Sequence, residues 1–584
     1  MKKKFLYLFT HFQFQFFAIL LIAILFRICF LSSGVLLGDE PLYSVRSIGF
    51  VDSFASDLQT TPFDWFPNGL PWWGTLSFHD HPPLFFIIQN LFFRNLGYSI
   101  FLSRLPAALF GIGSVIVSFF IGKQLYNKKL GIFCMGLMAI NDFSVVYTRV
   151  SMLESVTLFF ILLSFYFFLR SLKEKKFLYP WGIALGFSFL SKYVSFAIFP
   201  VYILGFFVYK REYLKSIRLY TAIFLSLIIF SPVIIYNIGM YRATGHFDLQ
   251  FAFLLKQDIS EHWKKLPGKT QRGDLLQRIS DMGTLLYLYT PVFFLFALSA
   301  FFYPIAKLFQ RKKWDTATFC TFLSTVCFLV FFLLIGARTR FLFYLTPFFI
   351  FLMVPFLRDF FDISKKWTKA FLWIWIAYEM FFSVNAVVAS TGRKIGKASV
   401  TYPKQLYLPD YGANALETYL RKELDDLKPN PHSRFKNQNY QSAVDRFYQL
   451  NMGQETPVFL FFDSRAGVGT LVQSYVRRTM YLGLPLAGIE SFPQYIFTIN
   501  ASNAHHLVYY IYSTPASSQN TNVNRPGMSP DVFKNKLDLL GIKPHNIYTH
   551  DGDIAYQIYK IDWSIALYAY KNVGGMSLPT DIRE

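Results

Sequence analysis

Long apolar runs separated by short polar connections dominate the first two thirds of the chain. After a first run that reaches Leu37, further runs lie at 104–124, 130–148, 155–172, 178–191, 194–209, 218–238, 283–304, 316–335, 341–357 and 369–389. Most are long enough to cross roughly 30 Å of hydrocarbon as helices. The chain is 53% hydrophobic and only 16% charged, which is too apolar for an ordinary soluble protein. The sequence therefore predicts a polytopic α-helical membrane protein with about eleven transmembrane helices.

The charges of the connections predict how these helices are threaded. Alternate connections are rich in lysine and arginine and share a side with Lys2-Lys3-Lys4; they lie at 126–129, 173–176, 210–215, 311–313 and 364–366. Since basic loops stay in the cytoplasm, we expect a cytoplasmic N-terminus, a first run retained as a signal anchor, and a multi-pass plasma (inner) membrane protein. The net charge of +22 then follows from topology, and no nucleic-acid partner is expected. The runs at 84–96 and 247–263 are predicted to lie in the outer interface.

Residues 391–584 are mixed in polarity, so we divide the chain into a membrane domain at 1–390, whose outer loop 38–103 carries the candidate motifs, and a C-terminal extracytoplasmic domain at 391–584. Helices are expected at 411–427 and 441–450, strands at 458–462, 507–512 and 555–559, and a loop at 517–530. This pattern predicts an α/β domain. The four cysteines all fall in apolar runs, which indicates neither a disulfide framework nor a zinc cluster.

An acidic pair, Asp39-Glu40, follows directly on the first apolar run. Carboxylates are costly beside hydrocarbon, so such residues are often functional. One interpretation is a general base, since a carboxylate at the edge of a low-dielectric cavity can be tuned to accept a proton. The other is a polar flank that ends the helix. Adjacent carboxylates repel each other, so a cationic group is expected nearby.

The stretch His79-Asp80-His81-Pro82-Pro83 offers such groups. Two prolines are typical of the first turn of a helix, and the polar residues before them can simply cap it. Alternatively, His81 and the helix N-terminus face a phosphate. In a third interpretation, His79, Asp80 and His81 help the acidic pair to hold a divalent metal ion, although their spacing is not diagnostic of a metal site.

Cationic residues on the predicted outer side break the expected charge bias: Lys192, Arg338 and Arg340. Arg149 and Glu154 form another outer turn, where they either flank two spans or act as a charge clamp and a second acid facing a cavity. Cations on an otherwise neutral or acidic outer surface are what a phosphate-binding site requires.

In the order and spacing of its motifs, the chain resembles membrane glycosyltransferases of the type C fold, the superfamily of protein O-mannosyltransferases and lipid A-modifying aminoarabinose transferases. The motifs are Gly38-Asp39-Glu40-Pro41-Leu42-Tyr43, His81-Pro82-Pro83-Leu84, Arg104-Leu105-Pro106-Ala107-Ala108-Leu109-Phe110-Gly111, Arg149…Glu154 and Gly182…Gly186…Leu190-Ser191-Lys192. The resemblance covers roughly residues 15–390.

This resemblance implies an inverting transfer of a monosaccharide from a polyprenyl-phosphate donor to a glycolipid such as lipid A, another envelope glycan or a protein hydroxyl. Asp39 corresponds to the catalytic acid of the family, with Glu40 beside it. His81 lies near the lipid phosphate, Arg149 and Glu154 form the Arg…Asp turn with a longer acid, and Lys192 belongs to the phosphate clamp with Arg338 or Arg340. No cofactor is implied beyond the metal ion considered above, and we find no nucleotide-binding glycine loop.

Two other classes of function remain open from the residues alone. A lipid-linked sugar transporter or flippase would show inverted repeats and charges near the bilayer midplane, whereas the charges here gather at one face. A membrane-anchored sensor with an outer ligand-binding domain would give Asp39, His81 and Lys192 no purpose.

Overall fold

The computed structural model describes residues 12–36, 38–50, 52, 66, 70–257, 275–310, 314–361, 365–389, 410–425, 458–463, 465, 474–478, 481, 484, 486–492, 507–517, 529–549 and 551–571. Backbone contacts divide the chain into two compact units. The first comprises Met1–Ser32, Phe50–Asp52 and Asn68–Leu406, and the second comprises Ser33–Gly49, Ser53–Pro67 and Tyr407–Glu584.

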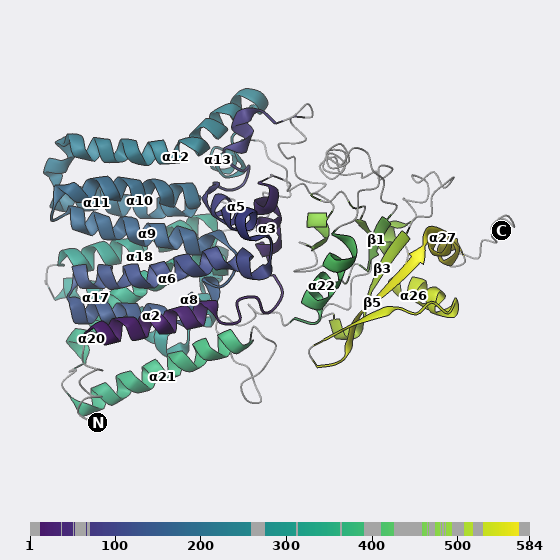
Figure 1. Ribbon diagram of the computed structural model, residues 1–584. Coiled ribbons are helices and arrows are strands. Elements are labelled where there is room, and N and C mark those ends of the chain that lie inside the picture. The colour runs from purple at the N-terminus through teal and green to yellow at the C-terminus, as the bar shows by residue number, and fades with distance from the viewer. Residues whose placement is uncertain are drawn as a thin grey trace. The chain divides into compact units, whose positions relative to one another are not determined.

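The first unit is a layered bundle of helices, several of which run side by side in Figure 1. Its helices are α2 (Phe12–Ile28), α5 (Leu84–Leu96), α6 (Ile100–Leu125), α7 (Lys128–Ile140), α8 (Asp142–Tyr147), α9 (Leu153–Ser171), α10 (Leu178–Ser191), α11 (Phe199–Tyr209), α12 (Ile217–Thr244), α13 (Leu249–Leu254), α15 (Leu275–Met282), α16 (Leu285–Leu288), α17 (Pro291–Phe309), α18 (Thr316–Ile335), α19 (Thr339–Leu342), α20 (Thr346–Phe360) and α21 (Lys366–Ala389). The predicted polytopic helical architecture is confirmed.

Seven helical segments in the described residues are long and apolar enough to cross a membrane: α6, α9, α12, α17, α18, the segment Thr339–Phe360 and α21. The predicted run at 130–148 forms two shorter helices, α7 and α8, and the predicted runs at 178–191 and 194–209 contain the short helices α10 and α11. Asn141 ends α7 and caps α8, because its side chain accepts a hydrogen bond from the Ser144 backbone N–H at 2.9 Å. The run at 84–96 forms the short helix α5, as expected. The count of about eleven spans stays a prediction.

Glycines allow α10 to pack closely against α12. A Cβ atom at Gly182 would lie 2.1 Å from the backbone oxygen of Ala222, and one at Gly186 would lie 2.9 Å from that of Ser226. Small residues serve this purpose between membrane helices, where close backbone approach replaces the hydrophobic driving force. The glycines therefore fix the spacing of the α9–α10–α12 layer.

A fully buried arginine, Arg27, lies in the last turn of the apolar helix α2. Its guanidinium donates hydrogen bonds to the backbone oxygens of Met138 at 3.1 Å and Ala139 at 3.2 Å, and to the hydroxyl of Ser144 at 3.3 Å. These acceptors compensate for the cost of placing a charge inside the bundle. Arg27 thereby joins α2 to the junction of α7 and α8.

The second unit contains a five-stranded mixed sheet in the order β2-β1-β3-β5-β4. Its strands are β1 (Val458–Phe462), β2 (Leu486–Gly488), β3 (Leu507–Ser513), β4 (His545–Tyr548) and β5 (Ile554–Asp562). β1 pairs in parallel with β2 and with β3, while β5 is antiparallel to both β3 and β4. The predicted C-terminal α/β domain is confirmed.

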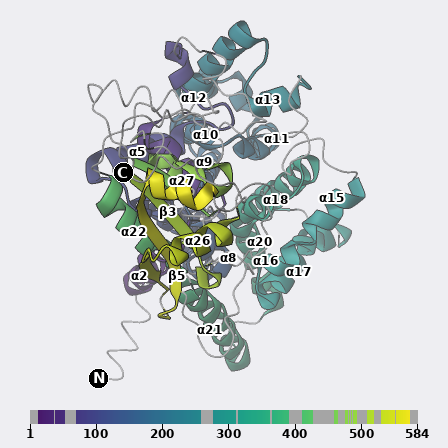
Figure 2. The same ribbon diagram turned by 90° about the vertical axis from the view of Figure 1, so that its right-hand side faces the viewer.

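Alternating side chains of the strands supply two apolar cores, one on each face of the sheet. One face packs against α22 (Ala413–Leu424), through Leu416 and Leu420 among others. The other face packs against α26 (Pro530–Leu539) and α27 (Trp563–Lys571), through Phe533 and Trp563. Figure 2 shows α27 lying across β3. Buried strands of the sheet explain the nearly continuous apolar sequence of β1.

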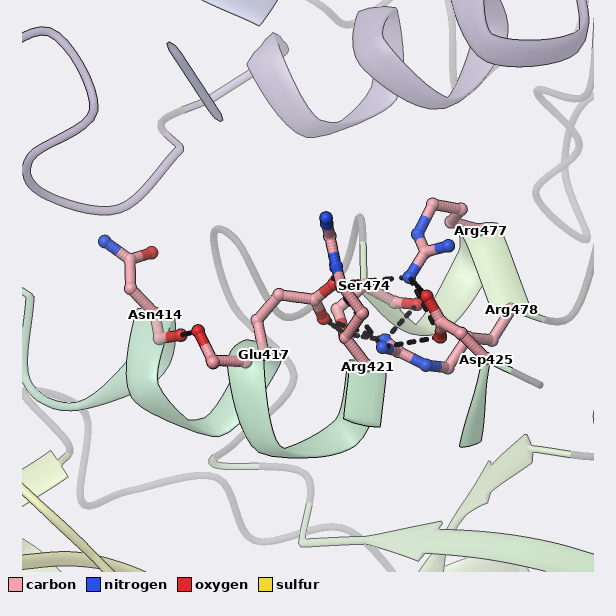
Figure 3. Close-up of polar contacts among 8 residues, drawn as sticks. Asn414, Glu417, Arg421, Asp425, Ser474, Arg477 and Arg478 are labelled. Atoms are coloured by element: carbon pink, nitrogen blue, oxygen red, sulfur yellow. Dashed lines mark hydrogen bonds and ion pairs between the residues drawn. The ribbon is translucent and has the colours of Figure 1, made fainter. Parts of the chain in front are cut away.

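A buried ionic network joins α22 to the segment 474–478. Figure 3 shows Arg477 and Arg478 converging on Glu417 and Asp425. Arg478 Nη1 lies 2.8 Å from Glu417 Oε2, and each arginine also pairs with Asp425 at 2.9 Å. Ser474 donates a short hydrogen bond to Glu417. The exposed Arg421 also lies 3.5 Å from Glu417, so three arginines surround the two carboxylates.

The predicted elements of the tail agree in part with this domain. The helix expected at 411–427 is α22, and the three expected strands are β1, β3 and β5. The helix expected at 441–450 lies outside the described residues. The strands β2 and β4 and the helices α26 and α27 were not predicted. β2 and β4 have only three and four residues, too few to show an alternation of apolar and polar side chains.

Candidate active site

Three of the predicted site residues meet in the first unit. Lys192 Nζ lies 2.5 Å from Glu154 Oε1, and Arg340 Nε lies 3.6 Å from the same oxygen. Glu154 is in the first turn of α9, Lys192 is the residue that ends α10, and Arg340 is in α19. Because α9 and α10 are consecutive antiparallel helices, the start of one lies beside the end of the other. We call these three residues the Lys192 cluster.

The Lys192 cluster is largely buried and brings two cations together. Glu154 is 0% exposed and Lys192 7% exposed. Both cations lie beside the one carboxylate of Glu154. The ring of Phe341 stabilises both cations through cation–π contacts, since its centroid lies 5.2 Å from Lys192 Nζ and 5.5 Å from the guanidinium carbon of Arg340. Two neighbouring cations in a partly desolvated site favour an anionic ligand.

Glu154 holds the two cations in place. Its Oε1 accepts a hydrogen bond from Lys192, while the buried Oε2 has no hydrogen-bond partner among the described residues. A carboxylate already paired with two cations is poorly suited to accept a proton. This geometry favours an orienting role for Glu154 over the catalytic role predicted from the sequence, which stays a prediction.

The predicted His-Asp-His stretch forms a loop, residues 77–83, which we call the histidine loop. His81 Nδ1 lies 2.8 Å from Asp80 Oδ2, and the His79 backbone N–H donates to Asp52 Oδ2 at 2.8 Å. Pro82 and Pro83 are buried and lead directly into α5. Both the predicted helix start and a loop that presents His81 are therefore present in the structure.

Within the described ranges, no group of three or more histidine, cysteine, aspartate or glutamate side chains could hold a metal ion. In the histidine loop, Asp80 pairs with His81 instead. The divalent metal proposed for His79, Asp80 and His81 stays a prediction.

The acidic pair belongs to the second unit, although the sequence assigned it to the membrane domain. Glu40 begins α3 (Glu40–Gly49) and is fully buried, whereas Asp39 is partly exposed and accepts a hydrogen bond from the Tyr43 hydroxyl at 3.2 Å. Tyr481 donates to the backbone oxygen of Val45 at 2.6 Å and thereby holds α3 in this unit. The base role of Asp39 stays a prediction.

The two remaining predicted residues are Arg149 and Arg338. Arg149 is buried and donates to the backbone oxygens of Phe26 at 2.7 Å and Phe30 at 3.2 Å. These contacts support the alternative in which Arg149 stabilises the end of a span. Arg338 is partly exposed and directly precedes α19, which carries Arg340. Phosphate binding by Arg149 and Arg338 is not tested by these contacts.

The sequence analysis missed a buried acid, Asp248, which caps α13. Its Oδ1 accepts hydrogen bonds from the backbone N–H groups of Gln250 at 3.1 Å and Phe251 at 3.0 Å. Its Oδ2 accepts from Asn237 Nδ2 at 3.0 Å and from the hydroxyl of Tyr193. Burial raises the pKa of Asp248, while these hydrogen bonds act in the opposite direction. An aspartate before a short apolar run was the available signal.

Residues 80–236 match the family described as dolichyl-phosphate-mannose-protein mannosyltransferase. A curated relative from Bacillus subtilis (strain 168), named "Putative mannosyltransferase YkcB", is 26% identical over 145 residues. That alignment covers 24% of this chain and 20% of the relative. The segment 80–236 that matches the family includes Asp80, His81, Glu154 and Lys192.

The fold is similar to that of ArnT from Cupriavidus metallidurans, whose crystal structures are known in the apo state and with undecaprenyl phosphate bound. The comparison with the bound form gives a TM-score of 0.51 at 12% identity and covers 94% of this chain and 98% of ArnT. The apo form gives a TM-score of 0.52 at the same identity and coverage. At this identity the similarity establishes the fold.

Proposed function

We propose that this chain is a membrane glycosyltransferase of the superfamily that contains the protein O-mannosyltransferases and ArnT. In this proposal it transfers a monosaccharide from a polyprenyl-phosphate donor to an acceptor outside the cytoplasm. The observation that carries this proposal is the Lys192 cluster, in which two cations meet at a buried carboxylate. Two of its members, Glu154 and Lys192, lie in the segment that matches the family. The bundle of apolar helices supports a donor that stays anchored in lipid.

The first step of the proposed reaction is recognition of the donor phosphate. Lys192 and Arg340 supply charge-assisted hydrogen bonds to its oxygens, and Glu154 keeps both cations aimed. The sequence analysis adds His81, Arg149 and Arg338 to this task. The same cations stabilise the charge that develops on the phosphate as it departs, which lowers the barrier to transfer.

The second step is a single displacement at the anomeric carbon. The acceptor oxygen or nitrogen forms a bond to this carbon, and the bond to the phosphate oxygen breaks with its electron pair, which releases polyprenyl phosphate. The proton of the acceptor passes to a base, for which the resemblance proposes Asp39, with Glu40 beside it. Attack opposite the leaving phosphate inverts the configuration.

The acceptor is a glycolipid such as lipid A, another envelope glycan or a protein hydroxyl. We place the protein in the plasma (inner) membrane with its N-terminus in the cytoplasm and its C-terminal α/β domain outside, because the basic connections follow the positive-inside rule. A divalent ion at the histidine loop stays an alternative to direct phosphate binding by His81.

Binding of undecaprenyl phosphate to the purified full chain, measured by native mass spectrometry, tests the phosphate site. Lys192→Met should weaken binding about tenfold or more, since it removes a buried charge from the site. Lys307→Met is a matched control, because Lys307 also pairs with a carboxylate, Asp359 at 2.9 Å, but away from the cluster. Equal affinities for both variants and the parent would remove the Lys192 cluster from the proposal.

Sugar transfer itself is tested in cells. Mass spectrometry of envelope glycolipids and glycoproteins should reveal a sugar-bearing species that a deletion strain lacks and that the parent gene restores. Asp39→Asn should fail to restore it while the protein accumulates normally. Full restoration by this variant would exclude Asp39 as the base.

A further inference from the structure

Asp248 is fully buried, yet the proposed reaction gives it no role. It accepts four hydrogen bonds: two from backbone N–H groups of α13, one from Asn237 and one from Tyr193. Asn237 also accepts from the Asp248 backbone N–H at 2.8 Å, so these two residues are joined reciprocally. An ionised carboxylate only accepts hydrogen bonds, and each of its partners here donates.

The partners of Asp248 connect two separate parts of the candidate site. Tyr193 directly follows Lys192 in the chain, and its hydroxyl donates to Asp248. On the other side, the Leu249 backbone N–H donates to the His79 backbone oxygen at 2.8 Å. Gln250 Nε2 donates to the Asp80 backbone oxygen at 3.2 Å. The residues directly after Asp248 therefore hold the histidine loop.

We infer that Asp248 is a positioning residue that fixes the histidine loop relative to Lys192, so that His81 and Lys192 act on the same phosphate. It does so by holding the start of α13 at one end and Tyr193 at the other. The role as a phosphate site rests on the proposed function, whereas the mechanical link between the two segments rests on these contacts alone.

Tyr193→Phe is the smallest change that tests the link, because it deletes one hydroxyl and keeps the ring, whose centroid lies 5.1 Å from that of Phe251. Tyr202→Phe is its matched control: the hydroxyl of Tyr202 is also buried and also makes one hydrogen bond, to Ser164 at 2.6 Å. This hydrogen bond between Tyr202 and Ser164 involves neither Asp248 nor the histidine loop. Asp248→Asn, which replaces an acceptor oxygen by a donor, gives a second variant.

Hydrogen exchange of the full chain in detergent measures how firmly Asp248 holds the histidine loop, and it needs no ligand. Amides of the histidine loop and of 249–251 should exchange about tenfold faster in Tyr193→Phe, because one charge-assisted hydrogen bond is lost. The same amides should be unchanged in Tyr202→Phe. Equal exchange in the two variants would overturn the inference.

A double-mutant cycle on the affinity for undecaprenyl phosphate measures whether Asp248 affects phosphate binding through the position of His81. If Asp248 aligns both segments, Tyr193→Phe and His81→Ala should be non-additive, whereas Tyr202→Phe and His81→Ala should add. Additivity in both cycles, with binding intact in the parent, would refute joint positioning. If the parent does not bind undecaprenyl phosphate but the loop exchange still responds, the donor class in the proposed function is wrong and the link between the segments stands.

Discussion

Removal of the Glu417 charge should destabilise the second unit strongly, and the effect should disappear in acid. Burial alone would raise the pKa of Glu417, but the charges of Arg478 and Arg477, with hydrogen bonds from Arg478 and Ser474, lower it from 4.5 to about 2. At ~1.4 kcal/mol per pKa unit, this shift corresponds to about 3 kcal/mol of stability. Loss of one partner from a buried ion pair costs a similar amount, roughly 3–5 kcal/mol.

The sign of the pH dependence follows from the lowered pKa. A carboxyl group whose pKa is lower in the folded than in the unfolded state stabilises the fold above the unfolded value, 4.5. This contribution is lost as the pH falls towards the folded value of about 2. Glu417→Gln should therefore cost about 3 kcal/mol at neutral pH and progressively less below pH 4.5.

Hydrogen exchange of α22 and of 474–478 in the full chain, measured from neutral pH to about 3, gives the local opening free energy. Glu423→Gln is the matched control, because Glu423 is on the same helix and makes a longer ion pair, 3.4 Å from Lys560. Its replacement should cost less than about 1 kcal/mol. Equal costs for the two variants, or a cost at Glu417 that does not shrink on acidification, would refute the reasoning.

Three further changes test the packing of the first unit. Gly182→Ala should lower the melting temperature by several degrees, because the new Cβ meets a backbone oxygen at 2.1 Å, whereas Gly136→Ala, whose Cβ has 3.7 Å to its neighbour, should not. Ser99→Ala should cost about 1 kcal/mol in thermal or denaturant unfolding, since Ser99 caps α6. Arg27→Met leaves several backbone oxygens without their donor, and gel filtration in detergent should show a reduced yield of monodisperse protein.

The bundle of apolar helices could be predicted from the sequence because long apolar runs follow directly from the bilayer as a solvent. Lys192 was identified because a cation on the predicted outer side breaks the expected charge bias. Its pairing with Glu154 follows from the short connection between α9 and α10, which brings the start of one helix beside the end of the other. The sequence pattern thus contained much of the Lys192 cluster.

Other features depend on contacts that no local pattern encodes. The assignment of the acidic pair to the second unit depends on Tyr481, which contacts Val45 from more than four hundred residues along the chain. Asp248 was missed because its importance comes from partners in α12, in the segment after α10 and in α13. Periodicity identifies an apolar face, but it does not identify which polar side chains meet beneath it.

The partners of Arg27 impose an order on the biogenesis of the protein. Its acceptors Met138 and Ala139 are 111 and 112 residues further along the chain. At ~5–20 residues per second, ribosomes need on the order of ten seconds to produce them. During this interval the first helix carries an arginine that lipid solvates poorly. We therefore expect stable integration of α2 only after α7 has been synthesised.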